Sequence, residues 1–302
     1  MHLSSHLTHL GASPDLVSII EAIAQTAASI PPLIHKNIAQ LGTVNATGDT
    51  QLKIDVVADQ LFIEAMQRIP AVMAVASEER EEPLICNPHG SYGVAFDPID
   101  GSKMTRSNSL SGSIAAIYPG GNFLQSGRNI EAALYVLYGP ATTLVCRIKG
   151  KPTQEYLLST GMFHPTFQLH RENLTIGDGK NYCPGGRRRE YLDHHHAEFI
   201  EALDTQNYRE RFFACGVADT NFILHEGGIF TYPCTEEKPE GVLRLLFEAA
   251  PLAFIMEGAG GRSSDGSQSL LDIVLKDIMQ RTPVYLGDKK LIERVEELYK
   301  KQ

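Results

Sequence analysis

The stretch VAFDPIDGS, residues 94–102, decides what we expect of this chain. Its first three residues are apolar and are typical of the end of a buried strand. Pro98 and Gly101 then predict a sharp turn, because proline fixes its own φ and glycine accepts left-handed backbone. Asp97 and Asp100, three residues apart at the mouth of this strand, can point at one spot. Two carboxylates that close repel each other, so a divalent cation between them is the natural remedy. The alternative is a surface Asp-Gly turn with no ligand.

Composition bounds the class of protein. The chain has 302 residues and is 43% hydrophobic, which suits one large or two medium domains. A net charge of -9 argues against nucleic acid and anionic membranes as partners. The five cysteines form no C-x-x-C pair, which argues against zinc sites and a secreted disulfide framework. Without a run of 18 apolar residues we expect no membrane span. We therefore expect a cytoplasmic protein, with a plastid or another organelle left open.

Helices and strands follow from residue periodicity. Ser13 and Pro14 are typical of a helix N-cap and first helical position. A polar stretch at 177–193 predicts a domain boundary near residue 175, which gives domains 1–175 and 176–302. Strands in series after two helices indicate helices packed against a sheet. The expected helices are 14–29, 50–68, 195–203 and 242–257, with a further segment of unassigned type at 217–225. The expected strands are 72–76, 113–118, 132–138, 142–148, 155–158, 163–169 and 229–232.

Several more acids have unusual neighbours. Glu78 and Glu79 follow the expected strand 72–76, although they also begin an acidic run that is typical of a solvated surface. Asp55 and Glu248 lie among apolar residues, where an uncompensated charge is costly. Each is therefore a satisfied core acid or a ligand. Arg244 precedes Glu248 by one helical turn, so a helix would place both on one face.

These residues occur in an order that resembles a known family. GD with a further Asp six residues later (Asp49, Asp55), SEE (77–79), DPIDGS (97–102), GGIFTYP (227–233) and LRLLFE (243–248) succeed one another. The chain resembles the fructose-1,6-bisphosphatase and sedoheptulose-1,7-bisphosphatase family over residues 40–290. Inositol-monophosphatase-like enzymes share DPIDGS but supply a later Asp in a W-D motif, and this chain has no Trp. The segments GDGKNYCPGG, YGPATTLV and LRLLFEAAPLAFIMEGAGGRSSDG favour the sedoheptulose-1,7-bisphosphatase branch.

The resemblance implies an α/β (α+β layered) fold with alternating α-β-α-β-α layers and mixed sheets. It implies a metal site in domain 1–175 and sugar-phosphate binding in domain 176–302. It also implies two or three Mg²⁺ ions, with Mn²⁺ as a substitute. The implied residues are Glu78, Asp97, the Ile99 carbonyl, Asp100 and Glu248 for the metals; Asp49 for a third ion; Asp55 and Glu79 for activating water; Gly101 and Ser102 for the transferred phosphoryl group; Arg211 of a neighbouring subunit and Tyr232 for the distal phosphate; and Arg244 for sugar hydroxyls.

The implied reaction converts sedoheptulose 1,7-bisphosphate to sedoheptulose 7-phosphate and phosphate, in the Calvin cycle or the pentose phosphate pathway. A fructose-1,6-bisphosphatase or dual-specificity enzyme is the alternative, and a homodimer or homotetramer is implied. Val242 stands where the fructose enzymes have Lys, Phe212 where they have Tyr, and Lys103-Met104 where they have Ser-Asn. These departures count against fructose 1,6-bisphosphate as the preferred substrate. Lys103 could add a cation near the scissile phosphate.

Two runs leave a choice. Arg187–Arg189 either form a solvated loop or bind a terminal phosphate. We expect His194–His196 to lie on the surface at the start of a helix. A catalytically inactive protein of the same fold is disfavoured, because every expected metal carboxylate is present.

Overall fold

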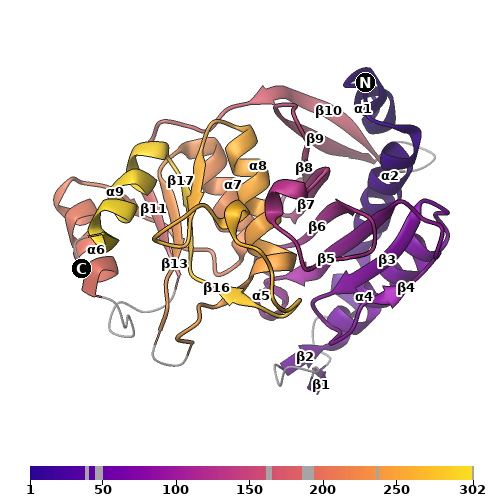
Figure 1. The fold of residues 1–302 in the computed structure, drawn as a ribbon, viewed down its shortest axis with the longest axis horizontal. Coiled ribbons are helices and arrows are strands. Elements are labelled where there is room, and N and C mark those ends of the chain that lie inside the picture. Colours follow the sequence, from indigo (N-terminus) through magenta and orange to yellow (C-terminus); the bar gives the residue numbers. More distant parts are fainter. Residues whose placement is uncertain (38–40, 45–49, 161–164, 186–193, 236–237, 301–302) are drawn as a thin grey trace.

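Five layers of secondary structure make up the molecule. A computed structural model describes residues 1–37, 41–44, 50–160, 165–185, 194–235 and 238–300. In these residues helices, a large sheet, a middle pair of helices, a smaller sheet and two outer helices follow one another (Figure 1). Both sheets contain parallel and antiparallel pairs. The expected α-β-α-β-α layering with mixed sheets is confirmed.

The large sheet has eight strands in the order β10-β9-β8-β7-β6-β5-β3-β4. Only the β3–β5 pair is parallel among the pairs described in this sheet. Its strands are β3 (Val72–Ser77), β4 (Leu84–Ile85), β5 (Tyr92–Asp100), β6 (Ser111–Pro119), β7 (Ala132–Tyr138), β8 (Thr142–Ile148), β9 (Thr153–Thr160) and β10 (Pro165–Leu174). The helices on its outer face are α1 (Leu3–His9), α2 (Pro14–Ala28), α3 (Ile30–Asn37) and α4 (Lys53–Gln67).

Helix α2 begins as the sequence predicts. The Ser13 hydroxyl accepts the N–H of Leu16, and Pro14 occupies the first turn. With α3 it forms a stretch, Pro14–Lys36, that is long and apolar enough to cross a membrane by length and composition alone. Its buried residues, such as Ile19 and Ile23, pack in one cluster with α4 and the sheet. A core helix has this same pattern, so the stretch carries no argument for a membrane span.

The smaller sheet has five strands in the order β12-β11-β13-β17-β15. Helices α7 and α8 lie between the two sheets, and α6 and α9 cover the far face (Figure 1). The strands are β11 (Asn181–Pro184), β12 (Arg209–Glu210), β13 (Ile229–Tyr232), β15 (Arg262–Ser264) and β17 (Val284–Gly287), and the helices are α6 (His194–Thr205), α7 (Gly216–Glu226), α8 (Ala250–Gly258) and α9 (Lys289–Tyr299).

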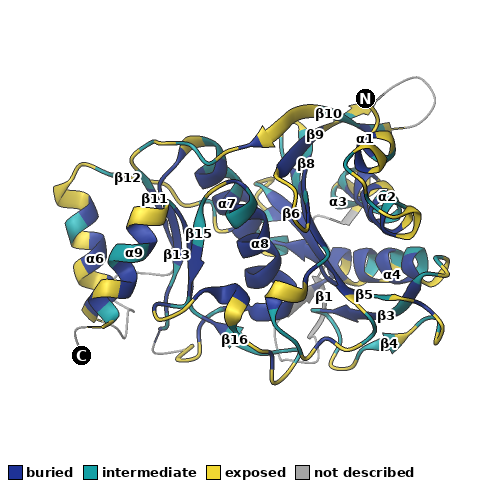
Figure 2. Cartoon of the chain, turned by 45° about the horizontal axis from the view of Figure 1, so that its top comes forward, coloured by how far each residue is buried: buried dark blue, intermediate teal, exposed yellow. Residues whose placement is uncertain are grey.

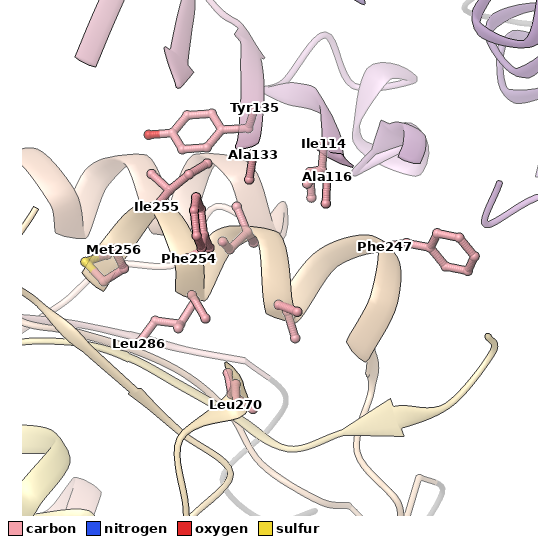
Figure 3. Close-up of a cluster of buried hydrophobic side chains, with 14 of the residues drawn as sticks. Ile114, Ala116, Ala133, Tyr135, Phe247, Phe254, Ile255, Met256, Leu270 and Leu286 are labelled. Carbon is pink, nitrogen blue, oxygen red and sulfur yellow. The ribbon is translucent and has the colours of Figure 1, made fainter. Parts of the chain in front are cut away.

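The middle layer is the most apolar part of the molecule. Side chains of α8, including Phe254 and Ile255, pack towards Ala133 and Tyr135 of β7, and Leu286 of the smaller sheet lies on the other side (Figure 3). Figure 2 shows most of α8 in dark blue, and its residues from Ala250 to Met256 are buried. Each such side chain contributes about 1.5–3 kcal/mol on full burial, so this layer holds the two sheets together.

Some elements begin elsewhere than expected. The helix predicted from residue 50 begins at Lys53, because Thr50–Leu52 (β2) pairs with Leu41–Val44 (β1). The helix predicted over 242–257 begins as strand β14 (Leu243–Arg244), paired with β16 (Arg281–Thr282), and continues as a π-helical turn, η3 (Leu245–Ala249). Strand pairing decides both starts, with a nearby segment in the first case and a distant one in the second.

The histidine run begins helix α6 as expected, and His194 is exposed, but the expected surface position is wrong for the next two residues. His195 and His196 are buried, and the Nδ1 of His196 lies 3.1 Å from the Tyr285 hydroxyl. The chain leaves the large sheet at Leu174 and enters the smaller one at Asn181. The division into two domains near residue 175 stays a prediction.

Candidate active site

Three carboxylates from two distant segments meet at one point. Asp97 and Asp100 lie at the end of β5, and Glu248 lies on the π-helical turn η3. One carboxylate oxygen from each lies within 4.8 Å of the others. The side chains are 3%, 7% and 7% exposed. The expectation that the DPID turn gathers acids is thus met by geometry.

A β-bulge aims the two aspartates. β5 pairs with β6 on both sides of the turn, with a register shift between Asp97 and Asp100. Asp97 Oδ1 accepts the N–H of Ile99 at 2.9 Å. The hydroxyl of Ser113 donates to the Pro98 carbonyl at 2.5 Å and lies 2.7 Å from the Tyr138 hydroxyl. A bulge turns successive side chains away from strict alternation, so both aspartates can face one site.

The π-helical turn places Glu248. Its Oε2 accepts the backbone N–H of Arg244 at 2.6 Å, which caps the turn. The guanidinium of Arg244 lies beside Glu78, with Nε 3.8 Å from Oε1, and donates to the carbonyl of Met279. Arg244 and Glu248 therefore do not form the side-chain pair on one helix face that the sequence suggested, because Arg244 belongs to a strand.

The cluster is electrostatically costly without a cation. Burial raises the pKa of Asp97 well above its ordinary value, and the charges of Glu78, Asp100 and Glu248 raise it further. Burial raises the pKa of Glu248 in the same way, followed by the charges of Glu78 and Asp100. Burial also raises the pKa of Glu78, although Arg244 opposes that shift. Buried carboxylate oxygens that repel one another fit a hard divalent metal ion.

A cleft of about 450 Å³ opens over the cluster. It joins the carboxylates to the DPIDGS turn and to the segment before η3, so one space holds acids, backbone donors and cations. Its lining residues are Asp55, Glu78, Glu79, Asp97, Ile99, Asp100, Gly101, Ser102, Lys103, Met104, Ala214, Lys238, Val242, Leu243, Glu248 and Arg281.

Asp55 is the acid in this cleft best suited to accept a proton. It lies in the first turn of α4, and its Oδ2 accepts the N–H of Leu52 at 2.6 Å. Burial raises its pKa to about 6, although that backbone bond, Ser102 and Lys103 oppose the shift. A carboxyl group with a pKa just below neutrality is ionised at pH 7 and still basic enough to take a proton from water.

The structure brings most of the predicted residues together, while their chemical roles stay predictions. Arg244 is buried behind Glu78 rather than on the cleft lining. Tyr232 is half-buried at the end of β13, and burial raises its pKa to about 12. Arg211 is exposed, and its Nη1 donates to the carbonyl of Glu210 at 2.7 Å. Asp49 and Arg187–Arg189 lie outside the described residues.

Some residues of the site escaped the sequence analysis. Lys238 and Arg281 line the cleft, and Cys215 contacts Asp100 from the start of α7. Arg281 donates to the carbonyl of Val242, so it also fixes the strand that leads into η3. Cysteine is not a usual N-cap residue, so the position of Cys215 before a helix did not mark it as part of the site.

Comparison with family models covers nearly the whole chain. A model described as the N-terminal domain of fructose-1-6-bisphosphatase matches residues 5–168, and one described as its C-terminal domain matches residues 176–300. The class 1 fructose-1,6-bisphosphatase of Methanospirillum hungatei JF-1 is 38% identical over 299 residues, covering 99% of this chain and 95% of that protein. The class 1 enzyme of Pelobacter propionicus is 37% identical, covering 94% and 88%.

Solved structures give the same picture. Leishmania major fructose-1,6-bisphosphatase in its holo form superposes with a TM-score of 0.93 at 27% identity, covering 100% of this chain and 99% of the other. A Toxoplasma gondii protein provisionally assigned as a sedoheptulose-1,7 bisphosphatase superposes with a TM-score of 0.90 at 28% identity, with the same coverage. Both likenesses extend over the cleft and both sheets.

Proposed function

This chain belongs to the fructose-1,6-bisphosphatase family, and from that premise we propose that it hydrolyses the 1-phosphate of fructose 1,6-bisphosphate. It is a hydrolase of sugar bisphosphates. The observation that carries the proposal is the trio Asp97, Asp100 and Glu248, whose oxygens lie within 4.8 Å beneath a cleft of about 450 Å³. A metal-dependent phosphatase needs such a cluster next to a space for its ester.

The choice of fructose over sedoheptulose bisphosphate reverses the preference drawn from sequence segments. The two class 1 relatives above are named for the fructose ester and cover at least 94% of this chain. Sedoheptulose 1,7-bisphosphate is the second candidate. It is favoured by Val242, an apolar side chain on the cleft lining where the fructose enzymes have Lys, and by the likeness to the Toxoplasma gondii protein.

Each part of the cleft has a task in the proposed reaction. Divalent metal ions held by Glu78, Asp97, Asp100 and Glu248 would neutralise the charge of the reacting phosphoryl group. Asp55, with Glu79 beside it on the lining, accepts a proton from the attacking water. The backbone of Gly101 and Ser102, where β5 turns into the short helix α5 (Ser102–Thr105), offers N–H donors to phosphoryl oxygens.

The non-reacting phosphate needs cations of its own. Lys103 and Lys238 line the cleft, and neither ammonium group takes part in an ion pair within the described residues. Tyr232 and Arg211 stay proposed partners of this phosphate, Arg211 from a neighbouring subunit of a homodimer or homotetramer. Arg244 stays a proposed partner of the sugar hydroxyls, although its guanidinium is buried beside Glu78.

The test is phosphate release from fructose 1,6-bisphosphate, sedoheptulose 1,7-bisphosphate and fructose 1-phosphate at one Mg²⁺ concentration. We expect the highest kcat/KM for fructose 1,6-bisphosphate, and loss of at least about 10³-fold in Asp100→Asn. Glu297→Gln, an exposed acid on α9, is the matched control and should act as wild type. A higher kcat/KM for the seven-carbon ester would select the second candidate, and full activity of Asp100→Asn would refute the site.

A further inference from the structure

The first turn of α7 ends on Asp100. The backbone N–H of Val217 donates to Asp100 Oδ2 at 2.6 Å, and Sγ of Cys215 lies 3.1 Å from the same oxygen. Asp100 belongs to β5 of the large sheet, whereas α7 belongs to the middle layer. One oxygen of a carboxylate in the acid trio is therefore held by a helix from the other half of the chain.

Cys215 occupies the N-cap position of α7, where its thiol lies between the first turn of the helix and Asp100. The Asp100 carboxylate serves as the helix cap. Backbone N–H groups are unsatisfied at this end of a helix, so a carboxylate oxygen is a natural acceptor there. Cys215 is only 3% exposed, so bulk water has little access to replace the thiol as a donor.

Packing leaves the thiol little freedom. A Cβ placed on Gly101 would lie 2.8 Å from the Cβ of Cys215, so the backbone of the DPIDG turn touches this side chain directly. The contact fixes the separation between the turn and α7.

We propose that Cys215 is a positioning residue for metal binding: its thiol holds Oδ2 of Asp100 and so orients Oδ1 for a divalent cation. The proposal rests on the metal dependence of the proposed function. Groups that orient a metal ligand typically change metal affinity 10- to 100-fold when they are removed. Cys215 acts through Asp100 and touches neither substrate nor the reacting atoms.

The test measures Mn²⁺ binding without substrate, by the loss of the free-ion electron paramagnetic resonance signal. We expect Cys215→Ala to raise the Mn²⁺ Kd about tenfold, and Cys215→Ser, which keeps a donor, to stay within about threefold of wild type. Cys146→Ala is the matched control, because Cys146 is as buried but lies on β8. It should lower Tm and leave Mn²⁺ affinity unchanged.

Kinetics give a second readout. In Cys215→Ala the Mg²⁺ concentration for half-maximal activity should rise about tenfold, while kcat at saturating Mg²⁺ and KM for the sugar ester change by less than about threefold. A purely structural role would lower Tm and leave the metal dependence alone, as in Cys146→Ala. If Cys215→Ala does not fold, Cys215→Val fills the space with a somewhat larger apolar side chain that has no donor, and it should show the same loss of metal affinity.

The outcomes separate this proposal from the proposed function. Wild-type Mn²⁺ affinity in Cys215→Ala or Cys215→Val overturns the positioning role, even if sugar bisphosphates are hydrolysed. A wild-type protein that binds Mn²⁺ but releases no phosphate refutes the function, while the Kd comparison still decides the role of Cys215. Failure of the wild-type protein to bind Mn²⁺ overturns both.

Discussion

Nε2 of His225 lies 2.8 Å from Oε1 of Glu155, and this pair ties the C-terminal end of α7 to β9. Nδ1 of the same ring lies 2.8 Å from the carbonyl of Asn221. Both partners can only accept hydrogen bonds, so His225 satisfies both only as an imidazolium. His170 and Arg171 of β10 also face Glu155, at 4.0 and 3.5 Å.

The pair predicts a pH dependence of stability. Burial lowers the pKa of His225, but its bonds to Glu155 and Asn221 outweigh burial and raise the pKa above 6.5. Burial raises the pKa of Glu155, but His225 and Arg171 outweigh it and lower the pKa below 4.5. The charged His225 makes its full contribution to the free energy of unfolding below pH 6.5, and this contribution is lost as pH rises through the folded pKa. The carboxylate contribution is present above pH 4.5 and is lost as pH falls.

We therefore expect His225→Gln to lower the free energy of unfolding by about 1.5 kcal/mol near pH 6 and by less at pH 9. Urea unfolding at both pH values measures this. His89→Gln, an exposed histidine, is the control and should show no such difference. An equal loss at both pH values would contradict the charged pair.

Asp97→Asn should separate stability from activity. Burial and the neighbouring acids raise the pKa of Asp97. Without metal, Asp97 therefore lowers the free energy of unfolding as pH rises from 3.8 through the folded pKa. With a chelator at pH 8 we expect the variant to unfold with about 1–3 kcal/mol more free energy than wild type. Mg²⁺ should stabilise wild type and not the variant, which releases no phosphate. If Asp97→Asn is less stable than wild type at pH 8 in chelator, Asp97 is not destabilised by repulsion from the neighbouring acids.

Lys103→Ser tests the cation next to Asp55. The ammonium group lowers the pKa of Asp55 against the stronger effect of burial, which raises it to about 6. Removing it should lower kcat and move the acid limb of the rate profile upward by less than about one pH unit, because Lys103 is exposed and screened. Lys289→Ser on α9 is the control. If kcat and metal dependence both stay unchanged, Lys103 has no part in the reaction.

Lys238→Gln tests the cation on the other wall of the cleft. The backbone N–H of Lys238 donates to the carbonyl and the hydroxyl of Thr235, both at 3.1 Å. If it binds the non-reacting phosphate, KM for fructose 1,6-bisphosphate should rise about tenfold, and KM for fructose 1-phosphate should not change. An equal rise for both esters would place Lys238 at the reacting phosphate instead.

Gly101→Ala tests the turn itself. Gly101 has φ +71° and lies against Cys215, whereas Gly120 has φ +70° and nothing within 4 Å of an added Cβ. Gly120→Ala should cost about 1–2 kcal/mol from backbone strain alone. Gly101→Ala should cost about 1–3 kcal/mol more, because the new methyl group overpacks the contact. Equal losses in urea unfolding would mean that the turn can move away from α7.

Local residue patterns determined much of the architecture. The strands β7, β8 and β13 have the bounds that apolar runs between glycines and prolines predicted. Gly101 marked the end of β5, but the sharp turn expected after Phe96 is wrong, because the strand continues through Pro98 to Asp100 with a bulge. Apolar neighbours marked Asp55 and Glu248 as unusual acids. These features depend on residues close in the chain, so periodicity and turn chemistry suffice to find them.

The tertiary structure decided how the site is assembled. The start of η3 depends on the pairing of β14 with β16, and this pairing turns Arg244 to Glu78 and Glu248 to the aspartates. The thiol of Cys215 reaches Asp100 only because α7 packs between the two sheets. No local pattern encodes these contacts, because they arise when segments far apart in the chain bury their apolar faces against each other.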